Sequence, residues 1–252
     1  MKLIPYIFCH GDTNQFLNLE DETLLYDCTR LSSHPFFELL EKLDQACFGG
    51  QGMGMERWTF YDCGAMPGVI YGYAIKRDDV TEVELIKSLG FEINDHEYLP
   101  LSMFIAIPKL GDGNWFAHNL CSIGGKFKVS GLGIKTKVDG LNAMRVKNLF
   151  GATQWGSPAV HIHSQIADLE LISAYTPNHS YPYTLTYKCR AKKWEQGETK
   201  RISSEYDRLI KVSDKEAINK IQIEIEKGLK VKINGRPELR DGEWCYPLSI
   251  YK

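Results

Sequence analysis

The sequence lacks the features that would place it in a special class of proteins. No apolar run approaches the roughly 18 to 20 residues that span a bilayer. The short apolar stretch before Cys9 has no small-residue cleavage site, although a lipoprotein signal ending at Cys9 is an alternative. The 30 basic residues nearly balance the 32 acidic residues, which gives a net charge of −2. The overall charge therefore gives no reason to expect binding to nucleic acid or to an anionic membrane.

Paired cysteines are also lacking. The seven cysteines are scattered singly and include no CxxC pair, which is typical of a reducing compartment rather than a disulfide framework. No low-complexity tract or repeat of fixed period interrupts the 252 residues, and 43% of them are hydrophobic. That is enough apolar surface for a sizeable core. We expect a folded cytoplasmic protein, and an enzyme on grounds of size and composition.

Apolar residues at helical or alternating spacing, separated by turn residues, predict a succession of helices and strands. Three local signals are clear: a Gly-Asp-Gly-Asn turn at 111–114, a Ser157-Pro158 helix start, and a Ser213/Glu216 capping box. The predicted order is strand 23–28, a helix from Ser33 to Gly49, strands 58–63 and 69–75, helix 78–90, hairpin 99–108/115–123, helix 134–146, strand 148–155, helix 157–166, strands 169–175 and 183–187, helix 214–227, and hairpin 230–233/244–251.

This order predicts an α/β (α+β) fold in which helices flank a mixed, mainly antiparallel central sheet. We expect residues 1–190 to form a core with an N-terminal elaboration. Residues 191–252 then form a C-terminal helix-plus-hairpin extension packed on that core.

The glycine loop Lys128-Val-Ser-Gly131-Leu-Gly133 lies between a predicted strand and an amphipathic helix. Glycines let consecutive backbone N–H groups approach a ligand, and the helix that follows adds free N–H groups and the positive end of its dipole. Positive charge surrounds the loop, from Lys126, Lys128, Lys135 and Lys137. The loop therefore predicts a site for a diphosphate or another anion, with a purely structural turn as the alternative.

The loop resembles the acyl-CoA-binding motif of the GNAT N-acetyltransferase superfamily, [Q/R]-x-x-G-x-[G/A], with Lys128 in the Gln/Arg position. The order of strands and helices over residues 57–190 is also similar to that of the family. The resemblance implies acyl-CoA, either acetyl-CoA or a longer one, as co-substrate, and no metal. It implies that the coenzyme is bound by Ile123, Lys128, Val129, Ser130, Gly131, Leu132 and Gly133.

The resemblance also implies that an amine attacks the thioester with the help of a base and an acid. For the base, the titratable residue on the predicted central strand is His118, with Glu97, Asp62 or a water chain as alternatives. For the acid, alignment with the family pattern N-x-x-A-x-x-x-Y puts Ala159 on the alanine and His163 on the tyrosine. An imidazolium can serve as that acid because its pKa lies near neutrality. The competing interpretation is that both histidines are structural.

Two other classes of function stay open. One is a non-catalytic CoA- or ligand-binding protein of the same fold. The other is a metal-dependent enzyme that uses His161 and His163, which would share one face if they lay on a strand, although Ser157-Pro158 favours a helix. Cys9-His10 as zinc ligands, and Cys121 as a nucleophile, have less support. Expected partners are a small-molecule acceptor, an acyl carrier protein as alternative donor, and a second copy of the chain in a homodimer; nucleic acid and membrane are not expected.

Overall fold

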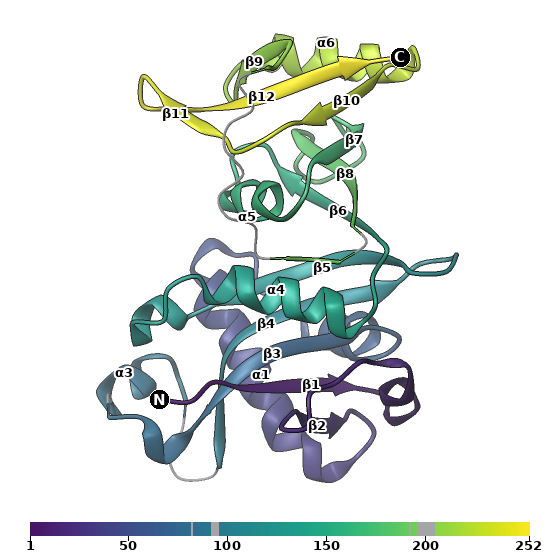
Figure 1. Ribbon diagram of the computed structural model, residues 1–252. Helices are drawn as coiled ribbons and strands as arrows, with labels where there is room; N and C mark the ends of the chain where they lie inside the picture. The colour runs from purple at the N-terminus through teal and green to yellow at the C-terminus, as the bar shows by residue number, and fades with distance from the viewer. Residues whose placement is uncertain (82, 92–95, 192, 196–204) are drawn as a thin grey trace. The chain divides into compact units, whose positions relative to one another are not determined.

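The structure is a computed structural model that describes residues 1–81, 83–91, 96–191, 193–195 and 205–252 (Figure 1). It consists of two compact units, an N-terminal unit (Met1–Val146) and a C-terminal unit (Lys147–Lys252). Each has a mainly antiparallel sheet flanked by helices, so the predicted fold class is confirmed. The division at 190/191 stays a prediction. No helix in the described ranges is long and apolar enough to cross a membrane.

In its described residues, the N-terminal unit contains five strands, in the order β5-β4-β3-β1-β2. Only β1 and β2 run parallel, and the other neighbours are antiparallel. Its main elements are β1 (Ile4–Cys9), β2 (Leu24–Asp27), α1 (His34–Phe48), α2 (Arg57–Thr59), β3 (Val69–Lys76), α3 (Val83–Ser88), β4 (Tyr98–Pro108), β5 (Asn114–Ser122) and α4 (Leu132–Ala143). The predicted hairpin is confirmed as β4 and β5.

Helix α4 packs closely on one face of this sheet. A Cβ atom on Gly140 would come within 3.1 Å of both Phe104 and Tyr71, so glycine allows this close approach of helix and strands. A buried chain of hydrogen bonds also crosses the contact. The Tyr6 hydroxyl donates to the Ser102 carbonyl at 2.9 Å, and Ser102 Oγ lies 2.6 Å from Thr136 Oγ1.

Two sequence-based predictions in this unit need correction. Residues 58–63, predicted as a strand, are helical: α2 continues into a π-helix at Phe60–Ala65. Phe60 is buried edge-on against Phe37 of α1, at 5.4 Å between ring centroids, so tertiary packing overrides the local β-propensity. The predicted helix 78–90 is a 3-10 turn at Arg77–Asp79 followed by α3, and residue 82 between them lies outside the described ranges.

Strand β1 has no counterpart among the predicted elements. It is fully buried between β2 and β3, so its sequence shows no polar-apolar alternation.

The C-terminal unit has an antiparallel sheet in the order β6-β8-β7-β10-β12-β11, and β9 also pairs with β12. Its elements are β6 (Asn148–Gln154), α5 (Pro158–Ile166), β7 (Leu169–Ser173), β8 (Thr184–Arg190), β9 (Arg208–Lys211), α6 (Lys215–Glu226), β10 (Lys230–Ile233), β11 (Glu238–Arg240) and β12 (Glu243–Tyr251). The predicted terminal hairpin is confirmed as β10 and β12, while β9 and β11 were not predicted.

In this unit, side-chain hydrogen bonds cap the N-termini of α5 and α6. Ser157 caps α5 as predicted, because its hydroxyl accepts a hydrogen bond from the Ala159 N–H at 3.2 Å. The cap of α6 is Asp214 and not the predicted Ser213: Asp214 Oδ1 accepts from the Ala217 N–H at 2.9 Å. The Ser213 N–H instead donates to the Glu243 carboxylate at 2.7 Å.

The Ser102–Thr136 contact generates a stability prediction. Replacing Thr136 with Val removes a hydroxyl that is fully buried, and leaves Ser102 Oγ without its partner. We expect Thr136→Val to lower the free energy of unfolding by about 1–3 kcal/mol. Ser102→Ala should lower the free energy of unfolding less in the Thr136→Val variant than in the native chain. In that variant the Ser102 hydroxyl has already lost its partner, and Ser102→Ala removes it. Urea unfolding of the four chains measures this coupling, and strictly additive losses would contradict it.

Candidate functional site

The predicted glycine loop joins β5 to α4, and its backbone is held in unusual conformations. A 3-10 turn at Gly124–Phe127 follows β5, and Lys128 then adopts a left-handed conformation with φ of 60°. Gly131, at the N-cap of α4, has φ of 69° and ψ of 5°, which glycine adopts without strain. The seven residues predicted to bind the coenzyme thus lie along one continuous turn-and-helix start.

The N-terminus of α4 is left open. Among the residues that the structure describes, no side chain caps it, and the first hydrogen bond back into the loop is from the Lys135 N–H to the Gly131 carbonyl, at 3.1 Å. In a helix the N–H groups of the first turn, here Leu132, Gly133 and Ile134, have no acceptor within the helix. A Cβ atom on Gly133 would meet only Ser122 Cβ, at 3.7 Å, so little bulk surrounds this turn. The arrangement suits a bound anion.

The four lysines near the loop are not equivalent. Lys126 and Lys128 are exposed. Lys135 forms an ion pair with Asp139 at 2.7 Å, and its ammonium lies 4.8 Å from the centre of the Tyr73 ring. Lys137 is only 1% exposed and lies over Phe104, so its predicted contribution to a surface anion site is wrong. Two lysines therefore remain to attract an anion from solvent.

His118, the predicted base, lies at a β-bulge that the sequence did not reveal. Ile105 of β4 pairs with Asn119, but the next residue, Ala106, pairs with Ala117, which leaves His118 as the extra residue on β5. Among the described residues its Nε2 atom is one of two buried side-chain polar atoms without a hydrogen-bond partner. Burial lowers the pKa of His118 below its usual 6.5. The imidazole is therefore neutral at pH 7 and can accept a proton.

A buried carboxylate that sequence analysis missed holds β5 on its other side. Asp44 of α1 is 1% exposed; its Oδ1 accepts from the Asn119 side-chain amide at 2.8 Å and its Oδ2 from the Met55 N–H at 2.7 Å. Burial raises the pKa of Asp44, and the two hydrogen bonds partly offset this. One signal was present in the sequence: Asp44 interrupts the apolar stripe of α1, four residues after Leu40.

His163, the predicted acid, is buried on α5 in the C-terminal unit. Its ring centroid lies 5.1 Å from that of Tyr187 on β8. The Tyr187 hydroxyl is the other buried polar atom without a hydrogen-bond partner in the described part of the chain, and burial raises its pKa. These contacts are those of a packed histidine, and the role of His163 as an acid stays a prediction.

The alternative metal interpretations receive no geometric support. On α5 the two histidines contact different rings. The ring centroid of His161 lies 4.0 Å from that of Trp244, whereas His163 packs on Tyr187. Residues two apart on a helix face about 200° apart, so they cannot bind one ion together. Across the ranges that the structure describes, no three His, Cys, Asp or Glu side chains are grouped to bind a metal.

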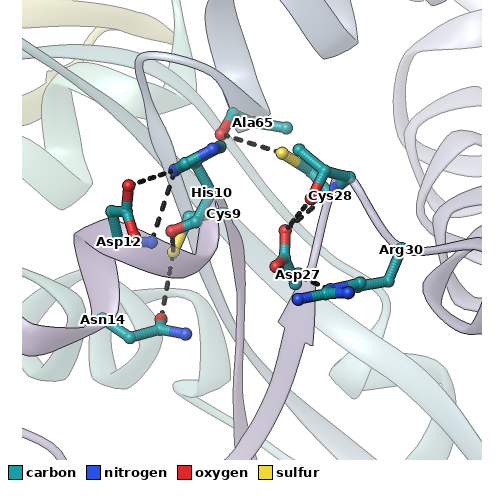
Figure 2. Close-up of polar contacts among 9 residues, drawn as sticks. Cys9, His10, Asp12, Asn14, Asp27, Cys28, Arg30 and Ala65 are labelled. Carbon is teal, nitrogen blue, oxygen red and sulfur yellow. Dashed lines mark hydrogen bonds and ion pairs between the residues drawn. The ribbon is translucent and has the colours of Figure 1, made fainter.

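The Cys9-His10 pair is occupied by local contacts at the ends of β1 and β2 (Figure 2). The Cys9 thiol donates to Asn14 Oδ1 at 3.2 Å, and His10 Nδ1 accepts from the Asp12 N–H at 3.3 Å. Glu97 and Asp62, the alternative bases, are both exposed. None of these residues shares the buried, unpartnered environment of His118 Nε2.

A groove of about 720 Å³ lies beside Lys126 in the N-terminal unit. Helix α1 supplies Glu38, Glu41 and Lys42 to its wall, and Ser88–Gly90 forms the other side. Burial raises the pKa of Glu41, while Arg57, 3.4 Å away, opposes this. A groove that combines carboxylates with ammonium groups suits a small polar or zwitterionic ligand.

Comparisons with known proteins concern the fold. No protein-family profile matches the chain, and no curated protein matches it. The ribosomal-protein-S18-alanine N-acetyltransferase from Escherichia coli is 10% identical, with a TM-score of 0.41 over 64% of this chain and 89% of that chain. An acetyltransferase of the GNAT family from Staphylococcus aureus Mu50 is 11% identical, with a TM-score of 0.40 over 62% of this chain and 93% of that chain. The second of these structures is named as a member of the GNAT family, to which the sequence was predicted to be similar, and at these identities and TM-scores the similarity carries nothing about substrate.

The environment of His118 generates a pH prediction. Its pKa is lower in the folded chain than in the unfolded chain, so its contribution to stability is present above pH 6.5 and is lost as the pH falls through the folded pKa. We therefore expect the native chain to lose more stability than His118→Gln between pH 7 and pH 5, as measured by urea unfolding. The exposed His34 provides the matched control, His34→Gln. Equal losses in the native chain and His118→Gln, or an NMR midpoint for His118 above 6.5, would contradict the prediction.

Proposed function

We propose that the protein is an acyltransferase that moves an acyl group from acyl-CoA to an amine of a small molecule. The observation that carries the proposal lies within the N-terminal unit. A bulged strand with a neutral, unpartnered imidazole leads through a glycine loop to the open N-terminus of a helix. The first feature supplies a base and the second supplies a diphosphate site, which are the two requirements of a CoA-dependent transfer to an amine.

The coenzyme diphosphate would be bound by backbone N–H groups. The donors are those of Leu132, Gly133 and Ile134, which point along the axis of α4 at its positive end. Lys126 and Lys128 would add attraction from the loop. Anion binding of this kind needs no side-chain cap at the helix start, which agrees with glycine at the N-cap.

The acceptor amine would arrive protonated, and it must lose a proton before it can attack the thioester carbonyl. His118 Nε2 is the group proposed to take that proton, because it is buried, neutral and without a hydrogen-bond partner among the described residues. Acid–base assistance of this type is worth about 10²–10⁴ in rate. The carboxylates Glu38 and Glu41 of the groove would attract the ammonium form.

Two alternatives share this geometry and are separable by measurement. A non-catalytic CoA-binding protein would bind acetyl-CoA without turnover over a panel of amines. An enzyme that uses an acyl carrier protein would need only the phosphopantetheine end of the donor, so free acyl-CoA would bind weakly while acylated carrier protein is consumed.

The diphosphate site is tested by adding charge at the first turn of α4. We expect Gly133→Glu to weaken acetyl-CoA binding by at least about 30-fold in calorimetry, from a repulsion of about 2 kcal/mol near the phosphates. Gly133→Gln, of equal size, should weaken it less. Ser180→Glu adds the same charge at an exposed position of the C-terminal unit and should leave affinity unchanged. If acetyl-CoA and longer acyl-CoAs do not bind, or bind Gly133→Glu normally, the proposed function fails.

A substitution at Lys128 is expected to change the stability of the chain and its affinity for acetyl-CoA in opposite directions. Its left-handed conformation is strained for a residue with a Cβ, so Lys128→Gly should stabilise the chain by about 0.5–1 kcal/mol in urea unfolding. The same change removes a positive charge and should weaken acetyl-CoA binding several-fold.

Lys126→Gly provides the matched control for that experiment, because Lys126 lies in the 3-10 turn and not at a position of positive φ. It should weaken binding in the same way but lower stability. If Lys128→Gly also lowers stability, or if neither variant changes the affinity, the assignment of this loop to an anion is wrong.

A further inference from the structure

Two cysteines lie on the two elements that meet where α1 packs on β5. Cys47 is in the last turn of α1 and is half-buried, whereas Cys121 is near the end of β5 and is 4% exposed. Both belong to the N-terminal unit, and they are far apart in sequence. Neither has a role in the proposed acyl transfer.

The register of the two elements brings these thiols together. The Asp44–Asn119 hydrogen bond, 2.8 Å long, joins α1 to β5. Cys47 follows Asp44 by three residues and so lies on the same helix face, and Cys121 follows Asn119 by two residues and so lies on the same strand face. Both cysteines therefore lie at the contact between α1 and β5, where each thiol affects the pKa of the other.

The surroundings give the two thiols different reactivity. The Cys121 thiol, the Ser122 N–H and Lys126 stabilise the thiolate of Cys47. Together they lower its pKa, although partial burial and the nearby Asp44 carboxylate act to raise it. Burial raises the pKa of Cys121 well above its usual value, and the Cys47 contact adds to the rise. Cys47 is therefore the thiol that reacts with a reagent from solvent, and Cys121 is the second thiol within reach.

A second pair of neighbouring cysteines provides a contrast. Cys9 and Cys28 are joined by a backbone hydrogen bond of 2.9 Å, but their thiols have different partners (Figure 2). The Cys9 thiol donates to Asn14, and the Cys28 thiol donates to the Ala65 carbonyl at 3.8 Å. Burial raises the pKa of both. Adjacent cysteines in this chain are thus not reactive by proximity alone.

We propose that Cys47 and Cys121 form a reversible disulfide, with a low-molecular-weight disulfide such as oxidised glutathione as the oxidant. The Cys47 thiolate attacks one glutathione sulfur, the S–S bond of glutathione breaks, and the glutathione thiolate that leaves takes up a proton. Cys121 then loses its proton and attacks the Cys47 sulfur, which releases the second glutathione as a thiol. Two protein thiols are oxidised and one glutathione disulfide is reduced to two thiols. The new bond covalently joins α1 to the strand that enters the glycine loop.

The test is oxidation of the full folded chain by oxidised glutathione, trapping of free thiols with N-ethylmaleimide, and mass mapping without reduction. We expect the Cys47–Cys121 crosslink to exceed every other cysteine pair by about tenfold or more, since the Asp44–Asn119 hydrogen bond holds the two elements that carry these cysteines together. Dithiothreitol should restore both thiols. Cys121→Ser should instead accumulate the mixed disulfide of Cys47 with glutathione, and Cys63→Ser, which removes another half-buried cysteine, should leave the crosslink unchanged.

A second measurement does not depend on the folding of any variant. Alkylation of Cys47 by iodoacetamide in the native chain should follow pH with a midpoint below that of the same residue in 8 M urea, about 8.5 for a free cysteine. The proposal is overturned if Cys47 remains a glutathione adduct in the native chain, pairs with another cysteine, or shows the same midpoint in both conditions. None of these outcomes depends on acyl-CoA binding.

Discussion

The hydroxyl of Thr136 fixes α4 to the sheet, and the geometry of the candidate site depends on this contact. It donates to the Leu132 carbonyl at 2.7 Å and so receives the hydrogen bond from Ser102 Oγ. Ser102 in turn is linked to β1 through Tyr6. All of these groups are buried, so sliding or rotating the helix would leave several polar atoms unpaired at about 1–3 kcal/mol each. The first turn of α4 is therefore held in place although its own N–H groups have no partner in the helix.

A second anchor acts on the other side of β5. Asp44 binds Asn119 on the strand and the Met55 N–H in the segment before α2, so one carboxylate joins three parts of the N-terminal unit. His118 lies directly before Asn119, at the bulge where pairing with β4 is interrupted. The strand is thus fixed immediately after the residue that departs from regular pairing, and the bulge is held in one place rather than free to slide along the hairpin.

The sequence predicted the elements whose pattern is local. The Gly-Asp-Gly-Asn turn predicts the β4–β5 hairpin, and Ser157-Pro158 predicts the start of α5. Residues 58–63 were mispredicted because their aromatic and β-branched composition was decided by packing against α1. The bulge at His118, the burial of Lys137 and the contacts of Asp44 depend on which residues meet across the fold, and a single chain pattern does not contain that information. The loop could therefore be predicted, but not the burial and the contacts of the residues near it.

The two buried polar atoms without partners differ in what surrounds them. The Tyr187 hydroxyl lies against Gly151, and the centroid of its ring lies 5.1 Å from that of His163. Burial raises the pKa of Tyr187 because it disfavours the phenolate. His118 Nε2 is neutral for the same reason, since burial disfavours the imidazolium. Desolvation thus makes the tyrosine a poor acid and keeps the histidine neutral at pH 7. A buried polar atom without a partner costs stability until a group of a ligand pairs with it.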